Sequence, residues 1–317
     1  MADDITKRIA RFIEPFRVTP GSHVKLAKDF DPAFHAGIET KKDGEGLLHD
    51  GIAILSDYQQ RLAAQATHGV VVVLQALDAA GKDGTIRHVM SGVNPQGVRV
   101  ESFKVPSAAQ LDQDYLRRYQ ERLPARGEIG IFNRSHYEEV LVVRVHPENL
   151  VAQKLPPDAR KHHVWKRRYH AINEWERYLT ENGFRVVKLF LNLSKEEQRR
   201  RFLRRIDLPE HNWKFSSHDV QERRHWDAYQ DAFSEMFTHT STEHAPWHVI
   251  PADRKWFARV AAAAVIGQAL IDIDPRYPTL GDNALRDLQE AKRELEAEAP
   301  DGAPADPFAT PAVEQPA

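Results

Sequence analysis

The chain contains no cysteine among its 317 residues. Disulfides, thiolate metal sites and cysteine nucleophiles are therefore excluded, and the absence fits a reducing compartment. Residues 1–7 lack the apolar core of a secretory signal. The longest run of small apolar residues, 260–273, is interrupted by Gln268 and Asp272 and is too short and polar to span a bilayer. These absences predict a soluble, cytoplasmic protein without membrane contact.

The chain also has little net charge, because 44 Lys and Arg residues nearly balance 46 Asp and Glu residues, for a formal net charge of −2. Such a balance gives no general electrostatic field for nucleic acid. Basic residues are instead concentrated in residues 160–168 and 195–205, which indicates a local site for a polyanion. Hydrophobic residues make up 41% of the chain, enough to bury the core of a large α/β domain.

Short apolar segments alternate with helical patterns through the middle of the chain. Strands are predicted at residues 70–74, 98–105, 129–132, 185–193 and 247–250. Helices are predicted at residues 47–66, 110–123, 138–145, 158–182, 195–206, 221–237 and 255–273. This alternation is typical of an α/β fold with a parallel, doubly wound, five-stranded sheet. A ligand is expected at the carboxyl ends of the strands, where Asp78, Asn133 and Asp253 fall.

Two flanking segments differ from this pattern. Residues 1–43 show no sustained period, so we expect an N-terminal extension that packs against the core without a strand of its own. The α/β domain is expected to span residues 44–280. Within the remaining segment, 281–317, an exposed helix rich in Glu and Lys is predicted at 284–299, and the Ala- and Pro-rich tail at 300–317 is predicted to be disordered.

Segment 69–85 carries the strongest chemical signal. It begins as an apolar strand, breaks into small residues and reaches Gly81 and Lys82. A helical pattern then begins, with one face formed by Ile86, Val89, Met90 and Val93. Strand, loop and helix together aim backbone N–H groups at phosphate oxygens, to which Lys82 adds a positive charge. The other loop residues expected to bind phosphate are Ala79, Ala80, Gly81, Asp83, Gly84 and Thr85.

The loop departs from the standard phosphate-binding pattern. Gly-x-x-x-x-Gly-Lys-Ser/Thr would place glycine at position 76 and a hydroxyl at position 83, but this chain has Ala76 and Asp83. The loop also contains Asp78, and a carboxylate beside phosphates is tolerated when a cation lies between them. Asp78 is therefore a candidate metal ligand, or a group that positions an attacking phosphate. The alternative is that Asp78 caps a turn and Lys82 is a surface lysine.

A second candidate segment follows the strand at 129–132, where the chain continues with Asn133 and Arg134. In phosphate-loop enzymes an acidic residue usually ends this strand and holds the metal, whereas Asn133 brings no charge. Arg134 suits bidentate binding of phosphate oxygens. The alternative is a helix N-cap at Asn133 or Ser135 beside a surface arginine.

A third segment, residues 195–227, reads as two helices joined by a polar turn. Arg201 and Arg205 lie one helical turn apart on the same face, and Lys214 and Arg223 are placed to approach them across the turn. An arginine-rich hairpin suits a lid that closes over phosphates, excludes water and neutralises charge on a transferred phosphoryl group. The alternative is a solvated helical hairpin.

With these segments in view, the chain resembles the second family of polyphosphate kinases. The matching motifs are Leu77-Asp-Ala-Ala-Gly-Lys-Asp-Gly84, Ser102-Phe-Lys-Val-Pro-Ser107, Phe132-Asn-Arg-Ser-His-Tyr-Glu-Glu-Val140, His211-Asn-Trp-Lys-Phe215 with Asp219 and Arg223, and Ala245-Pro-Trp-His-Val-Ile-Pro-Ala-Asp-Arg-Lys255. The resemblance implies a phosphate-loop kinase fold and a homotetramer or homodimer. It also implies phosphoryl transfer between inorganic polyphosphate and adenine or guanine nucleotides, dependent on Mg²⁺ with Mn²⁺ as a substitute.

The resemblance also assigns roles to residues. The catalytic set would be Asp78, Lys82, Asn133, Arg134, Arg201 and Arg205, with Asp78 as metal ligand and residues 199–226 as the lid. Further phosphate- or nucleotide-binding candidates are Lys104, Arg118, Glu138, Lys214, Arg223 and Lys255.

Asn133 bears on the acceptor. Many family members have Asp at this position, and Asn133 with Glu138 nearby is similar to the subgroup that phosphorylates both AMP and ADP. Two rival functions share these residues. One is a nucleoside-monophosphate kinase that uses ATP, which usually needs the full phosphate loop; the other is a regulatory protein that binds polyphosphate or nucleotide without turnover.

Overall fold

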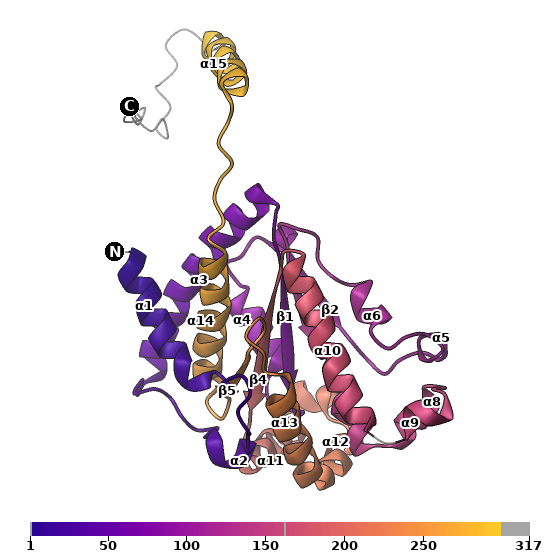
Figure 1. The fold of residues 1–317 in the computed structure, drawn as a ribbon. Coiled ribbons are helices and arrows are strands. Elements are labelled where there is room, and N and C mark those ends of the chain that lie inside the picture. Colours follow the sequence, from indigo (N-terminus) through magenta and orange to yellow (C-terminus); the bar gives the residue numbers. More distant parts are fainter. Residues whose placement is uncertain (1, 162, 299–317) are drawn as a thin grey trace. The chain divides into compact units, whose positions relative to one another are not determined.

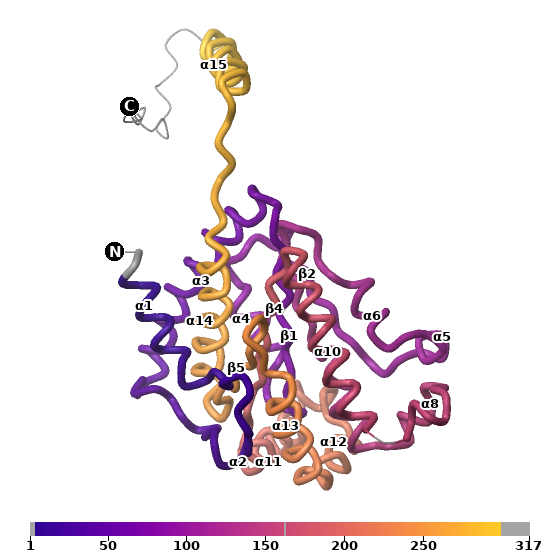
Figure 2. The backbone as a smooth tube through the Cα atoms, viewed as in Figure 1, coloured from indigo at the N-terminus to yellow at the C-terminus, as the bar shows by residue number. Residues whose placement is uncertain are grey.

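The structure is a computed structural model that describes residues 2–161 and 163–298 (Figures 1 and 2). The chain divides into two units, residues 1–276 and residues 277–317. The second unit contains α15 (Asp282–Ala297), which confirms the helix predicted near this position. The predicted disorder of residues 300–317 falls outside the described residues.

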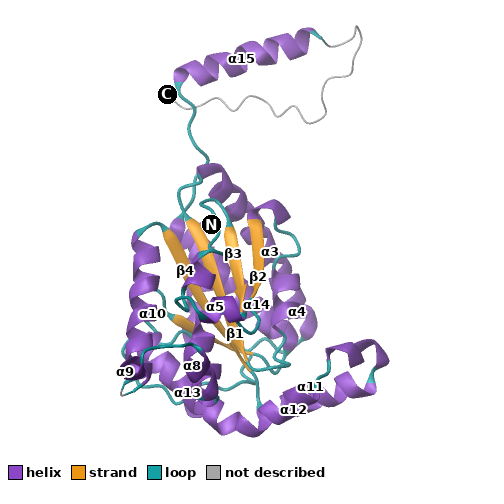
Figure 3. Cartoon of the chain, turned by 90° about the vertical axis from the view of Figure 1, so that its right-hand side faces the viewer, coloured by secondary structure: helices purple, strands orange, loops and turns teal. Residues whose placement is uncertain are grey.

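The first unit is built on a sheet of five parallel strands (Figure 3). In chain order the strands are β1 (Gly69–Ala76), β2 (Val98–Ser102), β3 (Ile129–Asn133), β4 (Phe184–Asn192) and β5 (Trp247–Pro251). The spatial order is β2-β3-β1-β4-β5, so β1 pairs with β3 on one side and with β4 on the other. This arrangement confirms the predicted α/β class and the parallel, doubly wound sheet.

Helices cover both faces of the sheet, as the apolar run of β1 requires. Alternate side chains of β1 point to opposite faces, so Val70 and Val72 join one buried cluster while Val71 and Val73 join another. The helices on the first face are α1 (Ala2–Ile13), α3 (Lys41–Gln65), α4 (Lys82–Val89) and α14 (Lys255–Ile273). Those on the second face are α10 (Val164–Glu181) and α13 (Trp226–Thr240). Figure 1 shows the two layers on either side of the strands.

On length and composition alone, α14 could span a bilayer. In this structure it lies against α3 and β4, and Ala261 and Leu270 are fully buried. A helix buried in the core of an α/β domain can be as apolar as a helix that spans a membrane.

Two long predicted helices are interrupted. Residues 110–123 form only two single turns, α5 (Ala108–Leu111) and α6 (Arg117–Gln120), because the side chain of Asp114 accepts a hydrogen bond from the Leu116 N–H and so favours a turn. Residues 158–182 form α9 (Pro157–Arg160) and α10, separated at His163, which has a left-handed φ of 61°.

Two further predicted helices also break. Residues 138–145 divide into the 3₁₀ helix η3 (His136–Val140) and α7 (Val142–Val145), and α8 (Glu148–Ala152) follows. Residues 221–237 divide into the end of α12 (Ser217–Glu222), the 3₁₀ helix η5 (Arg223–His225) and α13. The helix at 195–206 is confirmed as α11 (Lys195–Asp207). It leads through the 3₁₀ helix η4 (Pro209–Lys214) into α12.

The first 30 residues contain more structure than the sequence suggested. They form α1, a single antiparallel bridge between Arg17 and His248, and α2 (Leu26–Asp29). Phe16 is 1% exposed, and its ring centroid lies 5.9 Å from that of Phe257 on α14. This segment therefore adds to the core of the α/β unit.

Candidate active site

The phosphate loop leaves the carboxyl end of β1 and enters α4. Two of its residues have left-handed backbone, Ala79 with φ 66° and Gly81 with φ 106°. The side chain of Lys82 folds back over the loop, and its ammonium donates a hydrogen bond of 2.9 Å to the Ala76 carbonyl. Burial lowers the pKa of Lys82, and the negative charge of Asp78 opposes that shift. The ammonium of Lys82 therefore lies against the backbone of the loop, partly buried.

The turn after β3 brings the second candidate segment to this loop. Arg134 has a left-handed φ of 64°, and its N–H donates to the Leu74 carbonyl on β1 at 3.2 Å. One guanidinium nitrogen of Arg134 lies 3.4 Å from a carboxylate oxygen of Asp78. Burial by itself lowers the pKa of Arg134, but nearby Glu138 and Asp78 outweigh it and raise the pKa. Arg134 is therefore a permanent cation beside the loop.

Two unusual residues of the sequence are in contact. The amide of Asn133 donates a hydrogen bond of 2.8 Å to the carboxylate of Asp83. Asp83 stands where a serine or threonine is usual, and Asn133 stands where an acid is usual. One position has gained a negative charge and the other has lost one, so the pair keeps one charge in total.

Arg201, a predicted lid residue, is buried, and its guanidinium group acts as a clamp that binds protein oxygens of three segments. It is 6% exposed, and each guanidinium N–H is donated to a protein oxygen. Its Nη1 binds the carbonyls of Ala79 and Ala80 at 3.1 and 2.8 Å. Its Nη2 binds the carbonyls of Ala252 and Asp253 at 2.6 and 3.1 Å, and its Nε binds Glu197 at 2.9 Å. Arg201 therefore joins α11 to the phosphate loop.

The other lid residues link the hairpin to itself and to the loop. Arg205 lies 3.3 Å from Asp219 on α12. Arg223 donates to the side chain of Gln198 at 2.8 Å, and Gln198 in turn donates to the Asp78 carbonyl at 3.0 Å. Figure 3 shows α11 and α12 as a projecting hairpin at the lower edge of the sheet.

A cavity of about 420 Å³ opens between the loop, the turn after β3 and the hairpin. Four of the predicted site residues line it together: Asp78, Arg134, Glu138 and Arg223. The other predicted site residues are not among the described residues that line it. They are Lys82, Asn133, Arg201, Arg205, and the loop residues Ala79, Ala80, Gly81, Asp83, Gly84 and Thr85. Neither are the four candidates Lys104, Arg118, Lys214 and Lys255.

Each of these four has other surroundings. Arg118 donates to the Lys104 carbonyl at 2.8 Å and packs over the ring of Phe103. The ammonium of Lys214 lies 4.8 Å from the ring centroid of exposed Trp213. Lys255 begins α14, and burial and the charges of Arg201 and Arg204 lower its pKa.

Several residues that line the cavity were not predicted. They include His146 and Glu222, and an apolar wall of Leu141, Trp226, Tyr229 and Phe233. Asp219, which the sequence singled out only as part of a matching motif, lines the cavity as well. The aromatic residues of α13 recur at helical spacing, which in a sequence is indistinguishable from a core face. Tyr229 donates to Glu222 at 2.9 Å, and His146 contacts the same carboxylate oxygen at 3.0 Å.

The acidic residues of the cavity suit a hard cation supplied with the substrate. Among the described residues there is no group of three or more His, Asp or Glu side chains arranged for a metal ion. Asp78 has a side chain 35% exposed, and burial followed by the charge of Asp78 raises the pKa of Asp219. Mg²⁺ commonly takes one or two carboxylates and completes its shell with water and phosphate oxygens. The residues present fit that mode.

The fold and this loop geometry define a phosphate-loop kinase. The chain belongs to the family described as Polyphosphate kinase 2 (PPK2), which matches residues 39–277. It is 46% identical to the ADP-polyphosphate phosphotransferase of Rhodopseudomonas palustris, covering 88% of this chain and 97% of the relative. It is 44% identical to the AMP/ADP-polyphosphate phosphotransferase of Meiothermus ruber, covering 84% and 96%. The crystal structure of Polyphosphate Kinase 2 from Arthrobacter aurescens TC1 matches with a TM-score of 0.79 and 39% identity, covering 90% of this chain and 96% of the other.

Proposed function

We propose that this protein transfers the terminal phosphate of inorganic polyphosphate to nucleoside mono- and diphosphates, converting AMP to ADP and ADP to ATP. The observation that carries the proposal is that Asp78 and Arg134 line the cavity together, with Lys82 close enough for both of their charges to act on its pKa, in a member of this family. Such transfer is reversible in principle, and substrate levels set its direction.

Catalysis would rest on positioning and charge. The acceptor's own phosphate oxygen attacks in line, so no protein nucleophile is needed. Arg134 offers two N–H groups to the phosphates, and Lys82 and the loop N–H groups hold the other partner. The lid hairpin, carrying Arg205 and Arg223, excludes water when closed.

Mg²⁺ would be held by Asp78 and the substrate phosphates, with Mn²⁺ as a substitute. It would neutralise phosphate charge, which allows a carboxylate to lie in a phosphate-binding loop. The raised pKa of Asp219 makes this side chain a second candidate ligand, because a cation would relieve its repulsion from Asp78.

The nucleoside would lie at the other end of the cavity. Trp226, Phe233 and Leu141 offer an apolar wall for a base, and Glu222 offers an acceptor for hydroxyl or amino groups. The two relatives differ in their named acceptors, and Asn133 favours the one that acts on both AMP and ADP. A cytoplasmic location fits these substrates. The homotetramer or homodimer is still a prediction.

The test is a phosphotransfer assay with Mg²⁺ and long-chain polyphosphate, in which AMP and ADP are offered separately and products are followed by chromatography. We expect ADP from AMP and ATP from ADP, and no product with Lys82→Ala or Asp78→Ala. Product from ADP alone would contradict the dual-acceptor assignment. Phosphorylation of AMP only when ATP is the donor would instead identify a nucleoside-monophosphate kinase.

A further inference from the structure

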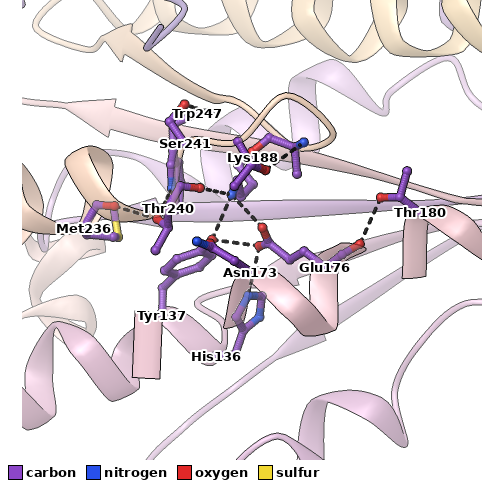
Figure 4. Close-up of polar contacts among 12 residues, drawn as sticks. His136, Tyr137, Asn173, Glu176, Thr180, Lys188, Met236, Thr240, Ser241 and Trp247 are labelled. Atoms are coloured by element: carbon purple, nitrogen blue, oxygen red, sulfur yellow. Dashed lines mark hydrogen bonds and ion pairs between the residues drawn. The ribbon is translucent and has the colours of Figure 1, made fainter. Parts of the chain in front are cut away.

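A charged network lies in the core behind the active site (Figure 4). It joins Lys188 on β4, Glu176 on α10, and His136 and Tyr137 at the start of η3. All four side chains have a relative exposure of 0%. None of them lines the cavity, so the network contacts no substrate there.

The ammonium of Lys188 has three N–H groups, and each has an acceptor. They are the Glu176 carboxylate at 2.6 Å, the Tyr137 hydroxyl at 2.9 Å and the Thr240 carbonyl at 2.6 Å. The Tyr137 hydroxyl then donates to the other oxygen of Glu176 at 2.7 Å. Lysine, glutamate and tyrosine therefore form a closed ring of hydrogen bonds.

His136 completes the network. Its Nε2 lies 3.2 Å from Glu176 Oε1, and since a carboxylate only accepts, Nε2 carries the proton. Burial lowers the pKa of His136, against the opposing effect of Glu176, so the ring is neutral. Its Nδ1 has no hydrogen-bond partner among the described residues. Glu176 is thus contacted by three side chains, and two of them are consecutive residues of one turn.

Burying an ion pair costs free energy, because both charges lose their hydration. Burial lowers the pKa of Lys188, which shows that the interior disfavours its charge even beside Glu176. Apolar residues of similar volume often replace such pairs with no loss of stability. What a hydrogen-bonded pair adds is direction, because it fixes the geometry of the groups that it holds.

The network holds His136 and Tyr137, which follow Arg134 closely in the chain. Arg134 has left-handed backbone, and the next residue, Ser135, accepts hydrogen bonds from the Gln75 side chain at 3.0 Å and from the Tyr137 N–H at 3.3 Å. The turn is thus tied to β1 on one side and, through Tyr137, to Lys188 on the other. A shift of His136 and Tyr137 would move Arg134 relative to Asp78.

We propose that the Lys188–Glu176 pair is a positioning device that holds the turn after β3 so that Arg134 faces the reacting phosphates. The pair acts through Arg134 and not on substrate, and the inference rests on the proposed function. A misplacement of about 1 Å in a reacting group can cost ~10²-fold in rate. The Thr240 carbonyl ends α13, so the same ammonium also anchors the helix that carries the aromatic wall of the cavity.

The test replaces the pair by apolar residues, in the double variant Lys188→Met/Glu176→Leu. We expect kcat to fall by ~10²-fold with KM for ADP little changed. The matched control is Arg185→Met/Asp272→Leu, which removes the ion pair of 3.1 Å near the amino end of β4. Its kcat should equal that of the wild type.

A double-mutant cycle separates positioning from general damage. In an Arg134→Lys background, the apolar pair should cost little further kcat, because the group that it positions is already altered. Equal losses in both backgrounds would overturn the proposal. Tyr137→Phe, which removes one hydroxyl and keeps the ring, gives the same readout if the double variant does not fold, and an unchanged kcat there would also overturn it. If the wild type transfers no phosphate from polyphosphate, the proposed function fails instead.

Discussion

Asn133 and Asp83 differ from the usual phosphate-loop residues, and their contact explains why they occur together. The amide of Asn133 gives the Asp83 carboxylate a hydrogen-bond donor at 2.8 Å. An acid at position 133 would place two carboxylates in contact, which is tolerated only when one is protonated or a cation lies between them.

We therefore predict that Asn133→Asp makes the stability of the protein depend on Mg²⁺. Its unfolding midpoint should fall in the presence of a chelator and recover when Mg²⁺ is added, while the wild type changes little. Thermal melts at both conditions measure this. The control is Asn133→Asp/Asp83→Asn, which restores an amide–carboxylate contact in reverse, and it should again be independent of Mg²⁺. Equal Mg²⁺ dependence in both variants would contradict the explanation.

Arg201 and Arg205 are one helical turn apart, yet their surroundings predict different losses. Arg201→Met leaves four backbone carbonyls without a donor and should lower the free energy of unfolding by ~3–5 kcal/mol. Arg205→Met breaks one partly exposed ion pair and should cost about 1 kcal/mol or less, while kcat falls by ~10³ if Arg205 stabilises the transition state. Chemical denaturation and steady-state kinetics of both variants would decide. Equal stability losses would show that Arg201 is no clamp.

At the scale of elements, two glycines near the phosphate loop, Gly81 and Gly84, should respond differently to an added side chain. Gly81 has φ 106°, a conformation that side chains disfavour, so Gly81→Ala should lower stability by ~1–3 kcal/mol. Gly84 lies within α4 without a positive φ, and an added Cβ would have no described atom within 4 Å. Gly84→Ala should therefore raise stability by ~0.5–1 kcal/mol. Melting curves of the two variants test the pair, and stabilisation by both would refute the strain at Gly81.

The strands were predictable because their signal is local. A strand buried on both faces must be a continuous apolar run, and residues 70–74 and 129–132 satisfy this on their own. The break at Asp114 and the helix α1 were not predicted, because a side-chain-to-backbone bond and docking against α14 decide them. Tertiary contacts therefore overrode periodicity at both places.

The site divides in the same way. Lys82 and Arg134 lie in local motifs. The structure places Arg134 beside Asp78 on the cavity wall, and the charges of both residues act on Lys82. Arg201 donates to carbonyls of residues that are 122 and 51 positions away in the sequence. Its spacing on the helix could not show these contacts and suggested a lid arginine that binds phosphate. Lys188 lies inside an apolar strand, and no pattern in the sequence indicates that it forms an ion pair with Glu176.

At the scale of the whole molecule, the N-terminal and C-terminal segments differ in how they contact the core. The sequence divides off residues 1–43 and 281–317, and that division is still a prediction. Both hydrophobic clusters consist of residues from the first unit, and they include Ile13, Phe16 and Val18 of the N-terminal segment. The N-terminal segment is therefore part of the core that supports β5 and α14.

This contrast gives the last prediction. Phe16→Ala removes a ring that is 1% exposed and packed on Phe257, so it should lower the free energy of unfolding by ~3–5 kcal/mol. A chain that ends at Arg276 keeps both clusters and nearly all of the family match, so its stability should change by less than ~0.5 kcal/mol and its phosphotransfer should be retained. Urea titration and the polyphosphate assay measure both variants. Phe34→Ala, at a ring 39% exposed, is the control for losing an aromatic side chain in the same segment. If truncation at Arg276 destabilises the protein as much as Phe16→Ala does, the C-terminal unit belongs to the core after all.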